Sequence, residues 1–459
     1  MNRSFLLAQA LLPDGFAQNV RVTVRDGLFV AVESNVTPNG ATAGEAQRIA
    51  GLALPGVPNL HCHAFQRGMA GLAERRGPAS DSFWTWREVM YRFLARLTPD
   101  DAEAIAAFAY MQMLERGFTA VAEFHYLHHD IDGQPYAELG EMAGRIAAAA
   151  AATGIGLTLL PSLYGYGGLG GQSPVAGQRR FLNDPDRFAR LVERSRALVS
   201  AVPGGKIGIA PHSLRAVTPE TLRAALEIVP DGPIHIHAAE QVKEVEDCVA
   251  WSGRRPVEWL LDEMPVDRRW VLIHTTHMTP EETVRLARSG AVAGLCPLTE
   301  ASLGDGIFDG ARYLGNGGRF GVGTDSNIDI DPAGELRQLE YSQRLAHRAR
   351  NVMATAEGES TGRRLLSEVL AGGAQALAQP MGAIAPGCRA DLVVLDTTHP
   401  DLACVSGDRV LDAVLFVAGR EAVASVMAGG AIVVEAGRHR AREAITARYG
   451  ATLNRILAA

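Results

Sequence analysis

Histidines and an aspartate stand at the ends of short apolar runs, and these residue types suit metal chemistry. Two His-x-His pairs, at 61–63 and 235–237, each end such a run, and His274 and Asp325 end two later ones. Side chains two residues apart on an extended chain point to the same face, so each pair can present two imidazoles together. Imidazoles and carboxylates are ligands that zinc and related divalent ions accept. The pattern therefore predicts a metal site at which these residues converge.

The segments that carry these residues alternate between strand-like and helix-like patterns. Eight apolar runs are expected to be strands: 56–61, 119–124, 156–162, 206–210, 233–237, 270–274, 291–296 and 320–324. Helical patterns lie between them, at 100–116, 136–152, 184–202, 219–228, 256–262 and 280–288. This alternation predicts a parallel sheet, and eight repeats predict its closure into an α/β fold of the (β/α)8 TIM-barrel type. Active sites of such barrels lie at the carboxyl ends of the strands, where the histidines and Asp325 are expected to meet.

Strand-like runs also occur at both ends of the chain. Runs separated by Asp-Gly, Pro-Gly and Gly-Gly turns predict strands at 5–12, 20–25, 28–32, 390–395, 410–417 and 432–434. Two β-rich segments around a long middle predict one discontinuous domain, a small β-sandwich formed by residues 1–55 and 381–437. The barrel is expected to span 56–380. Residues 438–459, rich in alanine and arginine, are expected to form a C-terminal helix.

Composition narrows the class of protein. The 459 residues carry 44 Lys plus Arg against 51 Asp plus Glu, a formal net charge of −7, and 47% of them are hydrophobic. Such a chain is typical of a globular protein and argues against binding to nucleic acid or an anionic membrane. Its five cysteines include no Cys-x-x-Cys pair, and no apolar run reaches the roughly 20 residues of a membrane-spanning helix. We therefore expect a cytoplasmic protein.

The order of these motifs resembles the amidohydrolase superfamily, whose members combine a metal-bearing barrel with a small β-domain made from both termini. The segment 382–395, Gly-Ala-Ile-Ala-Pro-Gly-Cys-Arg-Ala-Asp-Leu-Val-Val-Leu, is similar to that superfamily's return into the β-domain. The resemblance implies four metal ligands: His61, His63, His237 and Asp325. It implies three residues that move protons between water and substrate: Glu240, His274 and Asp325.

The lysines bear on the number of metal ions. Binuclear members of the superfamily hold a second ion with a carboxylated lysine at the end of the fourth strand. This chain has two lysines: Lys206 begins that strand, and Lys243 follows Glu240. Neither lysine is placed to hold a second ion, so the resemblance implies one divalent ion per chain. Zn²⁺ is the expected ion, with Fe²⁺ and Mn²⁺ as alternatives.

Four stretches are similar to the formimidoylglutamate deiminase family within this superfamily: Ala122-Glu-Phe-His-Tyr-Leu-His-His-Asp130, Ala210-Pro-His-Ser-Leu-Arg-Ala-Val217, 234–241, and 339–345 with Arg350-Asn351. That resemblance implies hydrolysis of an amidine C–N bond by a metal-activated water. N-formimidoyl-L-glutamate would be deiminated to N-formyl-L-glutamate and ammonia, a step of histidine degradation. The resemblance also implies a homodimer and five substrate contacts: Gln66, Arg87, Tyr126, His212 and Arg215.

A dianionic substrate needs local cations in a chain of net negative charge, and Arg87 and Arg215 are the expected ones. One alternative is another mononuclear aminohydrolase, acting on guanine, S-adenosylhomocysteine or a triazine. Those rings need aromatic stacking more than paired arginines. Imidazolonepropionase and a metal-free scaffold are further alternatives, and the complete set of ligand-type residues argues against the scaffold. Six other histidines are expected on the surface or behind the ligands: His128, His129, His277, His347, His399 and His439.

Overall fold

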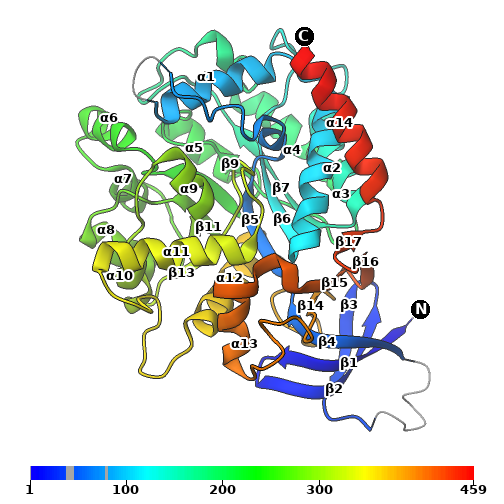
Figure 1. The fold of residues 1–459 in the computed structure, drawn as a ribbon. Coiled ribbons are helices and arrows are strands. Elements are labelled where there is room, and N and C mark those ends of the chain that lie inside the picture. The colour runs from blue at the N-terminus through cyan, green and yellow to red at the C-terminus, as the bar shows by residue number, and fades with distance from the viewer. Residues whose placement is uncertain (1, 38–45, 78–80, 459) are drawn as a thin grey trace.

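The computed structural model describes residues 2–37, 46–77 and 81–458 of the chain. A barrel with surrounding helices forms the larger part, and strands from the N-terminus lie below it in Figure 1. All five cysteines are free thiols, and Cys62, Cys248 and Cys296 are buried. Within the described ranges, none of the helices combines the length and apolar character that crossing a membrane requires.

The described residues form a closed parallel barrel with eight strand positions. One sheet contains β5 (Val57–Cys62), β6 (Phe118–His125), β7 (Gly156–Leu163) and β8 (Lys206–Ile207), with β9 (Ala210–Pro211) pairing with β7 beyond β8. The other contains β10 (Ile234–Ala238), β11 (Trp270–His274), β12 (Val292–Leu295) and β13 (Arg319–Val322). Parallel bridges close the ring, from Ile209 to Ile234 and from Cys62 to Asp325. The predicted barrel is confirmed, although its fourth strand is split into β8 and β9.

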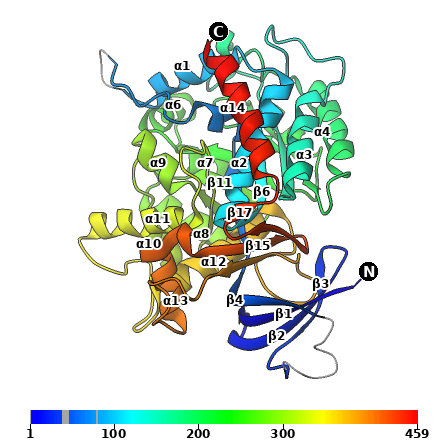
Figure 2. The same ribbon diagram turned by 45° about the vertical axis from the view of Figure 1, so that its right-hand side comes forward.

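Helices surround the barrel and alternate with its strands along the chain (Figures 1 and 2). They are α2 (Pro99–Arg116), α3 (Glu141–Thr153), α4 (Pro185–Val199), α5 (Pro219–Leu226), α6 (Val242–Ser252), α7 (Pro256–Glu263), α8 (Pro280–Ser289), α9 (Pro297–Leu303), α10 (Gly310–Gly315), α11 (Pro332–His347) and α12 (Thr361–Leu377). Five of them begin with a capping side-chain oxygen followed by proline, at Thr98, Asp184, Thr218, Thr279 and Asp331. The capping oxygen accepts from a free N–H of the first turn and proline suits that turn, so these helix starts are set locally.

A further helix, α1 (Phe83–Leu94), lies at the top of the molecule in Figure 1, beyond the barrel strands. Its C-terminal end is fixed by Arg180, a residue that is only 3% exposed. The guanidinium of Arg180 donates hydrogen bonds to the carbonyl oxygens of Leu94 and Leu97 and to that of His129. This single side chain therefore connects α1 to the segment that follows β6.

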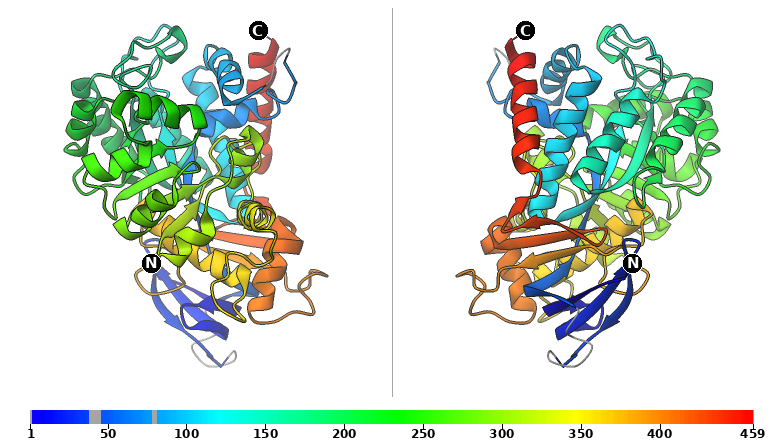
Figure 3. Two further views of the ribbon diagram at one scale, coloured as in Figure 1. Left: turned by 90° about the vertical axis from the view of Figure 1, so that its left-hand side faces the viewer. Right: turned by 90° about the vertical axis from the view of Figure 1, so that its right-hand side faces the viewer.

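Strands from both chain ends form one separate sheet of eight described strands. In spatial order they are β17 (Arg438–His439), β16 (Ala431–Glu435), β15 (Val423–Ala428), β14 (Leu392–Leu395), β4 (Gln47–Pro55), β1 (Arg3–Leu12), β2 (Gly15–Arg25) and β3 (Leu28–Glu33). β14 runs antiparallel to β4, with Leu392 opposite Pro55. The N-terminal strands of this sheet lie at the end of the barrel opposite α1 (Figure 3). N-terminal and C-terminal residues thus pair directly, as expected.

One predicted strand of this sheet is wrong. Residues 410–417 form the end of helix α13 (Asp408–Ala413) and a π-helical turn (Val414–Ala418), and the neighbouring strand of the sheet is β15. The β-branched and aromatic residues of 410–417 are typical of a strand. Their buried positions, however, recur with the spacing of a helix face: Val410, Leu411, Val414, Leu415 and Ala418.

A single glycine joins the terminal sheet to the barrel. β4 ends at Pro55 and β5 begins at Val57, so Gly56 is the whole connection. A Cβ at Gly56 would lie 2.2 Å from Oγ1 of Thr119, so Thr119 would have to shift to admit any larger residue. Glycine thus allows the close packing where the chain passes from one sheet into the other.

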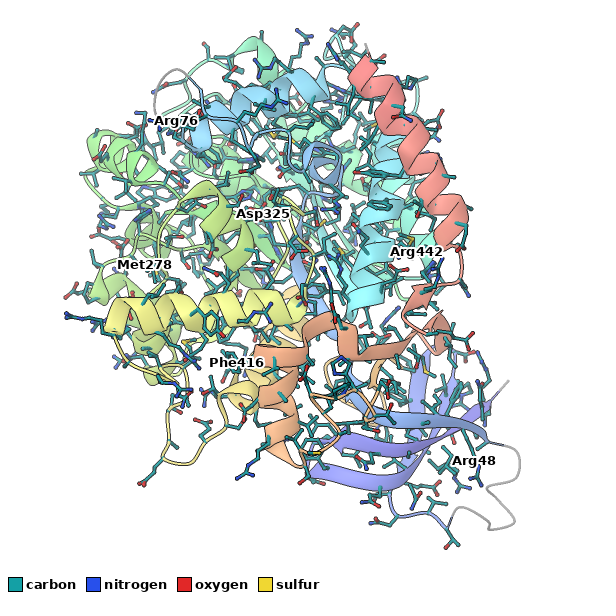
Figure 4. The ribbon with its side chains drawn as sticks, viewed as in Figure 1. Arg48, Arg76, Met278, Asp325, Phe416 and Arg442 are labelled. Carbon is teal, nitrogen blue, oxygen red and sulfur yellow. The ribbon has the colours of Figure 1, made fainter. Side chains whose placement is uncertain are left out.

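The C-terminal helix α14 (Arg442–Ala458) packs along α2 (Figure 2). The rings of Phe108 and Tyr449 stack with centroids 3.9 Å apart. Arg442, labelled at the start of α14 in Figure 4, forms an ion pair with Glu115 of α2. The helix is thus held by aromatic packing and by charge.

Candidate metal centre and active-site cavity

Five side chains converge at the carboxyl ends of four barrel strands: His61 from β5 and His63 just beyond it, His237 from β10, His274 from β11 and Asp325 just beyond β13. The Nε2 atoms of His61 and His63 each lie 3.4 Å from Oδ1 of Asp325. Ligand atoms of His61, His63 and Asp325 lie within 4.8 Å of one another, and so do those of His61, His237 and His274. The residues that were expected to meet do meet, and Figure 4 labels Asp325 in the interior of the barrel.

Unusual backbone conformations hold two of these residues in place. His274 and Asp325 have φ angles of 68° and 43°, in the left-handed region that residues other than glycine rarely adopt. Asn327 supports the turn, because its Nδ2 donates to the carbonyl oxygens of His63 and Asp325, both at 3.1 Å. Gly323 permits the close approach, since a Cβ there would lie 2.6 Å from the carbonyl oxygen of His61. Strain of this kind is typical of functional sites.

Hydrogen bonds orient two of the histidine rings. Nδ1 of His63 lies 2.8 Å from the carbonyl oxygen of Phe124, and Nδ1 of His237 lies 2.8 Å from that of His212. A carbonyl oxygen can only accept, so each Nδ1 donates and each Nε2 keeps its lone pair for another partner. His61 is fully buried, and neither of its ring nitrogens has a hydrogen-bond partner among the described residues.

This donor set fits a divalent metal ion. Burial lowers the pKa of His61 to about 3, and it also lowers the pKa of His63 and of His237. The imidazoles are therefore neutral, which is the form that binds metals. A buried nitrogen without a partner costs roughly 1–3 kcal/mol, and a metal ion would satisfy the orphaned nitrogen of His61.

Two carboxylates flank the ring of His274. Its Nδ1 lies 3.2 Å from Oε1 of Glu300, and its Nε2 lies 3.9 Å from Oε1 of Glu240. Burial opposes protonation of His274, but Glu240, Glu300 and Asp325 outweigh it and raise the pKa of His274 to about 10. Burial raises the pKa of Glu240. A buried carboxyl and imidazole so close together can pass a proton to and from a bound molecule.

Glu300 is a part of the site that the sequence pattern missed. Its Oε1 accepts a hydrogen bond from the backbone N–H of Cys296 at 2.8 Å, as well as facing His274. The sequence feature that could have indicated Glu300 is its position, in the first turn of α9 directly after a barrel strand. Acidic residues in a first helical turn are common, however, because they stabilise the helix dipole, so this signal alone is weak.

A cavity of about 690 Å³ opens over the cluster, and two arginines line it. Arg87 comes from α1, and Arg215 follows β9. The guanidinium of Arg87 lies 4.6 Å from the ring centroid of Trp84, and that of Arg215 lies 5.7 Å from the ring centroid of Phe83. In the described part of the chain, the buried Nε of each arginine has no hydrogen-bond partner. Unfilled guanidinium donors in an enclosed cavity suit an anionic ligand.

The other three expected substrate contacts also line this cavity: Gln66, Tyr126 and His212. Nε2 of Gln66 donates to the hydroxyl of Tyr126 at 2.9 Å, and Oε1 of Gln66 is buried with no donor among the described residues. The ring of His212 packs against that of Tyr126, with centroids 5.6 Å apart. Two cavity residues that were not expected are Tyr164 and Phe181. The structure therefore brings all five expected contacts to the same cavity as the histidine and aspartate cluster.

Several other histidines support the structure behind the site. Nε2 of His235, the first member of the second His-x-His pair, is hydrogen-bonded to the carbonyl oxygen of Ala376. His128, His129 and His439 are buried, and each is hydrogen-bonded to a backbone carbonyl oxygen. These four imidazoles join neighbouring segments and do not belong to the histidine and aspartate cluster.

The barrel with this cluster defines a class of protein, and comparison with known families agrees. The model of the amidohydrolase family matches residues 52–433. The chain therefore belongs to the amidohydrolase family, whose members are metal-dependent. A second model, described as formimidoylglutamate deiminase HutF, N-terminal domain, matches residues 5–45.

Individual relatives agree with this assignment. The formimidoylglutamate deiminase of Pseudomonas aeruginosa is 51% identical over 451 residues, which cover 98% of each chain. The crystal structure of an amidohydrolase from Brucella melitensis has a TM-score of 0.94 at 52% identity, covering 99% of this chain and 100% of that one. An adenosine deaminase from Xanthomonas campestris with bound zinc has a TM-score of 0.82 at 20% identity, covering 99% and 98%, and shows the shared fold.

Proposed function

We propose that this chain is a hydrolase that deiminates N-formimidoyl-L-glutamate to N-formyl-L-glutamate and ammonia. The observation that carries the proposal is a single cavity with the histidine and aspartate cluster at one side and the paired arginines Arg87 and Arg215 at another. The cluster suits metal-assisted hydrolysis, and the arginines suit a substrate with carboxylates. The identity of 51% over 98% of the chain to a formimidoylglutamate deiminase supports this substrate.

One divalent ion per chain is held by four residues in this proposal: His61, His63, His237 and Asp325. Such an ion would act as a Lewis acid and would lower the pKa of a bound water to roughly 7. Imidazole and carboxylate ligands support Zn²⁺, with Fe²⁺ as the alternative. The positions of the two lysines support a site with one metal ion rather than two. Lys206 is exposed at the start of β8, and the Nζ of Lys243 pairs with Asp247 at 2.8 Å.

The reaction replaces the imino nitrogen of HN=CH–NH–R by the oxygen of water and releases ammonia. A proton must therefore leave the attacking water, and protons must reach the departing nitrogen. Asp325 and His274 are placed to orient the water, and the ionised Asp325 to take its proton. His274, which is protonated because its pKa is raised, and Glu240 beside it are placed to deliver protons to the imino nitrogen. Each well-placed acid or base contributes about 10² to 10⁴ in rate.

The remaining cavity residues recognise the substrate. Arg87 and Arg215 bind the carboxylates of glutamate through their unfilled N–H groups. The unpartnered Oε1 of Gln66 accepts a hydrogen bond from an N–H of the substrate, while Tyr126 and His212 enclose the amidine. Recognition of charge thus occurs at the arginines, and chemistry occurs at the histidine cluster.

Ammonia release from formimidoylglutamate, guanine and S-adenosylhomocysteine, measured with the same metal-loaded preparation, tests the proposal. Consumption of imidazolone propionate is measured in parallel. We expect formimidoylglutamate to have by far the highest kcat/KM. A higher kcat/KM for a purine substrate would assign the chain to the aminohydrolase alternative, and turnover of imidazolone propionate alone would assign it to imidazolonepropionase.

We also propose the division of the chain into a terminal β-domain (1–55 and 381–437), a barrel (56–380) and a C-terminal segment (438–459). The helix expected over the whole of that segment begins only at Arg442, because Arg438–His439 form β17 of the terminal sheet. The direct pairing of β4 with β14 supports a discontinuous first unit. Five free cysteines support a cytoplasmic location, because disulfides are rare in reducing compartments. The proposed homodimer is supported by the family resemblance, and light scattering of the purified protein tests it.

A further inference from the structure

We propose that the hydroxyl group of Tyr164 is a further specificity determinant, which donates a hydrogen bond to one carboxylate of the substrate. The inference rests on the proposed function and concerns the groups that recognise the charge of the substrate. Tyr164 lies directly after β7, is 7% exposed and lines the same cavity as Arg87 and Arg215. No role in substrate recognition was expected for it from the sequence pattern.

Gln178 fixes the direction of the hydrogen bond at the Tyr164 hydroxyl. The backbone N–H of Val175 donates to Oε1 of Gln178 at 2.8 Å, which identifies that atom as the amide oxygen. Nε2 of Gln178 is therefore the amide nitrogen, and it donates to the hydroxyl oxygen of Tyr164 at 2.8 Å. An amide nitrogen cannot accept, so the proton of the Tyr164 hydroxyl has to be donated to another group.

The described residues provide no acceptor for this proton. The only hydrogen bond that the Tyr164 side chain forms with them is the one that it accepts from Gln178. The ring cannot easily turn away, because it packs against His212 with centroids 4.6 Å apart and against Phe181 at 5.5 Å. The hydroxyl is thus held as a donor without a protein partner.

The surroundings of this donor identify its ligand as an anion. Burial raises the pKa of Tyr164, and the positive charges of Arg215 and Arg87 act against that rise. All three residues line one cavity, and the buried Nε of each arginine has no hydrogen-bond partner within the described ranges. A carboxylate can accept from a phenol and from guanidinium groups at the same time. A water molecule or a neutral ring offers fewer acceptor sites to three such donors.

The substitution Tyr164→Phe tests the proposal, because it removes the hydroxyl and keeps the ring on His212. We expect kcat/KM for formimidoylglutamate to fall about 10- to 100-fold, chiefly through KM, as for a lost hydrogen bond to a charged group. Tyr166→Phe is the matched control: Tyr166 lies two residues further along and lines a different cavity. It should keep kcat/KM within about twofold.

Two truncated substrates separate a carboxylate contact from a structural effect. N-formimidoylglycine lacks the side-chain carboxylate, and 4-formimidoylaminobutyrate lacks the α-carboxylate. If Tyr164 binds one carboxylate, the variant and the wild type should have equal kcat/KM for the analogue without that group. An unchanged kcat/KM for formimidoylglutamate, or equal losses with all three substrates, would overturn the proposal. Failure of the proposed function is a different result, since it appears in the wild type as no turnover of formimidoylglutamate.

Gln178→Glu provides a second test through the orienting residue. Its carboxylate can still accept from Val175, but it would accept the proton of Tyr164 rather than donate to its oxygen. We expect a loss in kcat/KM similar to that of Tyr164→Phe, and little further loss when the two substitutions are combined. Fully additive losses would contradict the inferred direction of this hydrogen bond.

Discussion

The guanidinium of Arg215 lies 3.5 Å from the carboxylate of Glu240, measured between Nη2 and Oε2. The side chain of Glu240 is buried at 5% exposure, and that of Arg215 is mostly buried at 14%. Arg215 therefore stands between the cavity wall proposed to bind the charge of the substrate and the carboxylate proposed to transfer protons. A substrate carboxylate that binds Arg215 competes with Glu240 for the same positive charge. Binding of the substrate and the proton affinity of Glu240 are coupled through this one cation.

Arg215→Met should lower kcat/KM for formimidoylglutamate by roughly 30-fold to several-thousand-fold. Loss of a charge partner in a desolvated site costs roughly 2–5 kcal/mol, at 1.36 kcal/mol per tenfold change. Arg215→Lys should recover only part of the lost kcat/KM, because an ammonium group cannot form the paired hydrogen bonds of a guanidinium. Steady-state kinetics with metal analysis checks this. Arg223→Met, at a side chain 52% exposed, is the control; a fully active Arg215→Met enzyme would remove Arg215 from the site.

Elemental analysis of purified protein should find about one divalent ion per chain. His63→Asn and Asp325→Asn should each reduce the bound metal and lower activity by orders of magnitude, because metal binding requires the full ligand set. His347→Asn, at an exposed histidine of α11, should change neither quantity. Two ions per active chain would contradict a mononuclear centre.

Glu240→Gln and His274→Asn should keep their metal but lose about 100-fold or more of kcat. The reason is that each removes a group placed to move a proton, whereas the four proposed ligands remain. Parallel measurement of metal content and kcat distinguishes this outcome from loss of the metal. A metal-loaded variant with nearly normal kcat would show that its residue moves no proton in the rate-limiting step.

Arg180→Met should destabilise the fold by about 3 kcal/mol or more, because it leaves buried carbonyl oxygens without a donor at the end of α1. The carbonyl oxygens concerned are those of Leu94, Leu97 and His129. Urea unfolding measures the change, and KM should rise too, since α1 carries Arg87. Arg190→Met, exposed on α4, is the control. Equal midpoints for both variants would show that the hydrogen bonds of Arg180 contribute little.

Glu123 should make stability depend on pH. Its carboxylate accepts from the backbone N–H of Ala64 at 2.8 Å and from the hydroxyl of Tyr110 at 3.0 Å. Burial raises its pKa to about 7, against roughly 4.3 in an unfolded chain. The folded state binds this proton more tightly, so its contribution to stability is complete below pH ~4.3 and is lost as the pH rises through 7.

The variant Glu123→Gln isolates this effect, because its amide can accept from Ala64 and donate to the oxygen of Tyr110. The free energy of unfolding of the wild type should fall relative to the variant between about pH 5 and 8, by on the order of 3 kcal/mol. Urea titrations at several pH values measure this difference. Parallel curves for the two proteins would show that Glu123 does not titrate in this range.

The barrel could be predicted from sequence because its strands are short, mostly apolar runs that alternate with helical patterns. The terminal sheet was harder, because its strands are separated in sequence and no local pattern states which of them pair. Residues 410–417 illustrate the problem: their β-branched composition favoured a strand, but the burial of Val410, Val414 and Ala418 on one face is helical. Tertiary packing overrode local propensity there.

The candidate site likewise contains some residues that could be predicted from the sequence and others that could not. The convergence of His61, His237 and Asp325 follows from strand register, which the alternation of elements reveals. The contacts of Tyr164 and Glu300 depend on the course of loops after the strands. Gln178 orients Tyr164 from a separate turn 14 residues away. No spacing rule links such residues, so their relationship could be found only in three dimensions.

The position of β14 between β4 and β15 has a consequence for biosynthesis. On a ribosome, β1 to β4 emerge early, yet the strand that covers the free edge of β4 follows about 340 residues later. At roughly 5–20 residues per second, that edge remains uncovered for roughly 17–70 seconds. Exposed strand edges pair with other chains, so the open edge of β4 is a site of aggregation until β14 is made. A nascent chain that stops short of β14 would carry that open edge permanently.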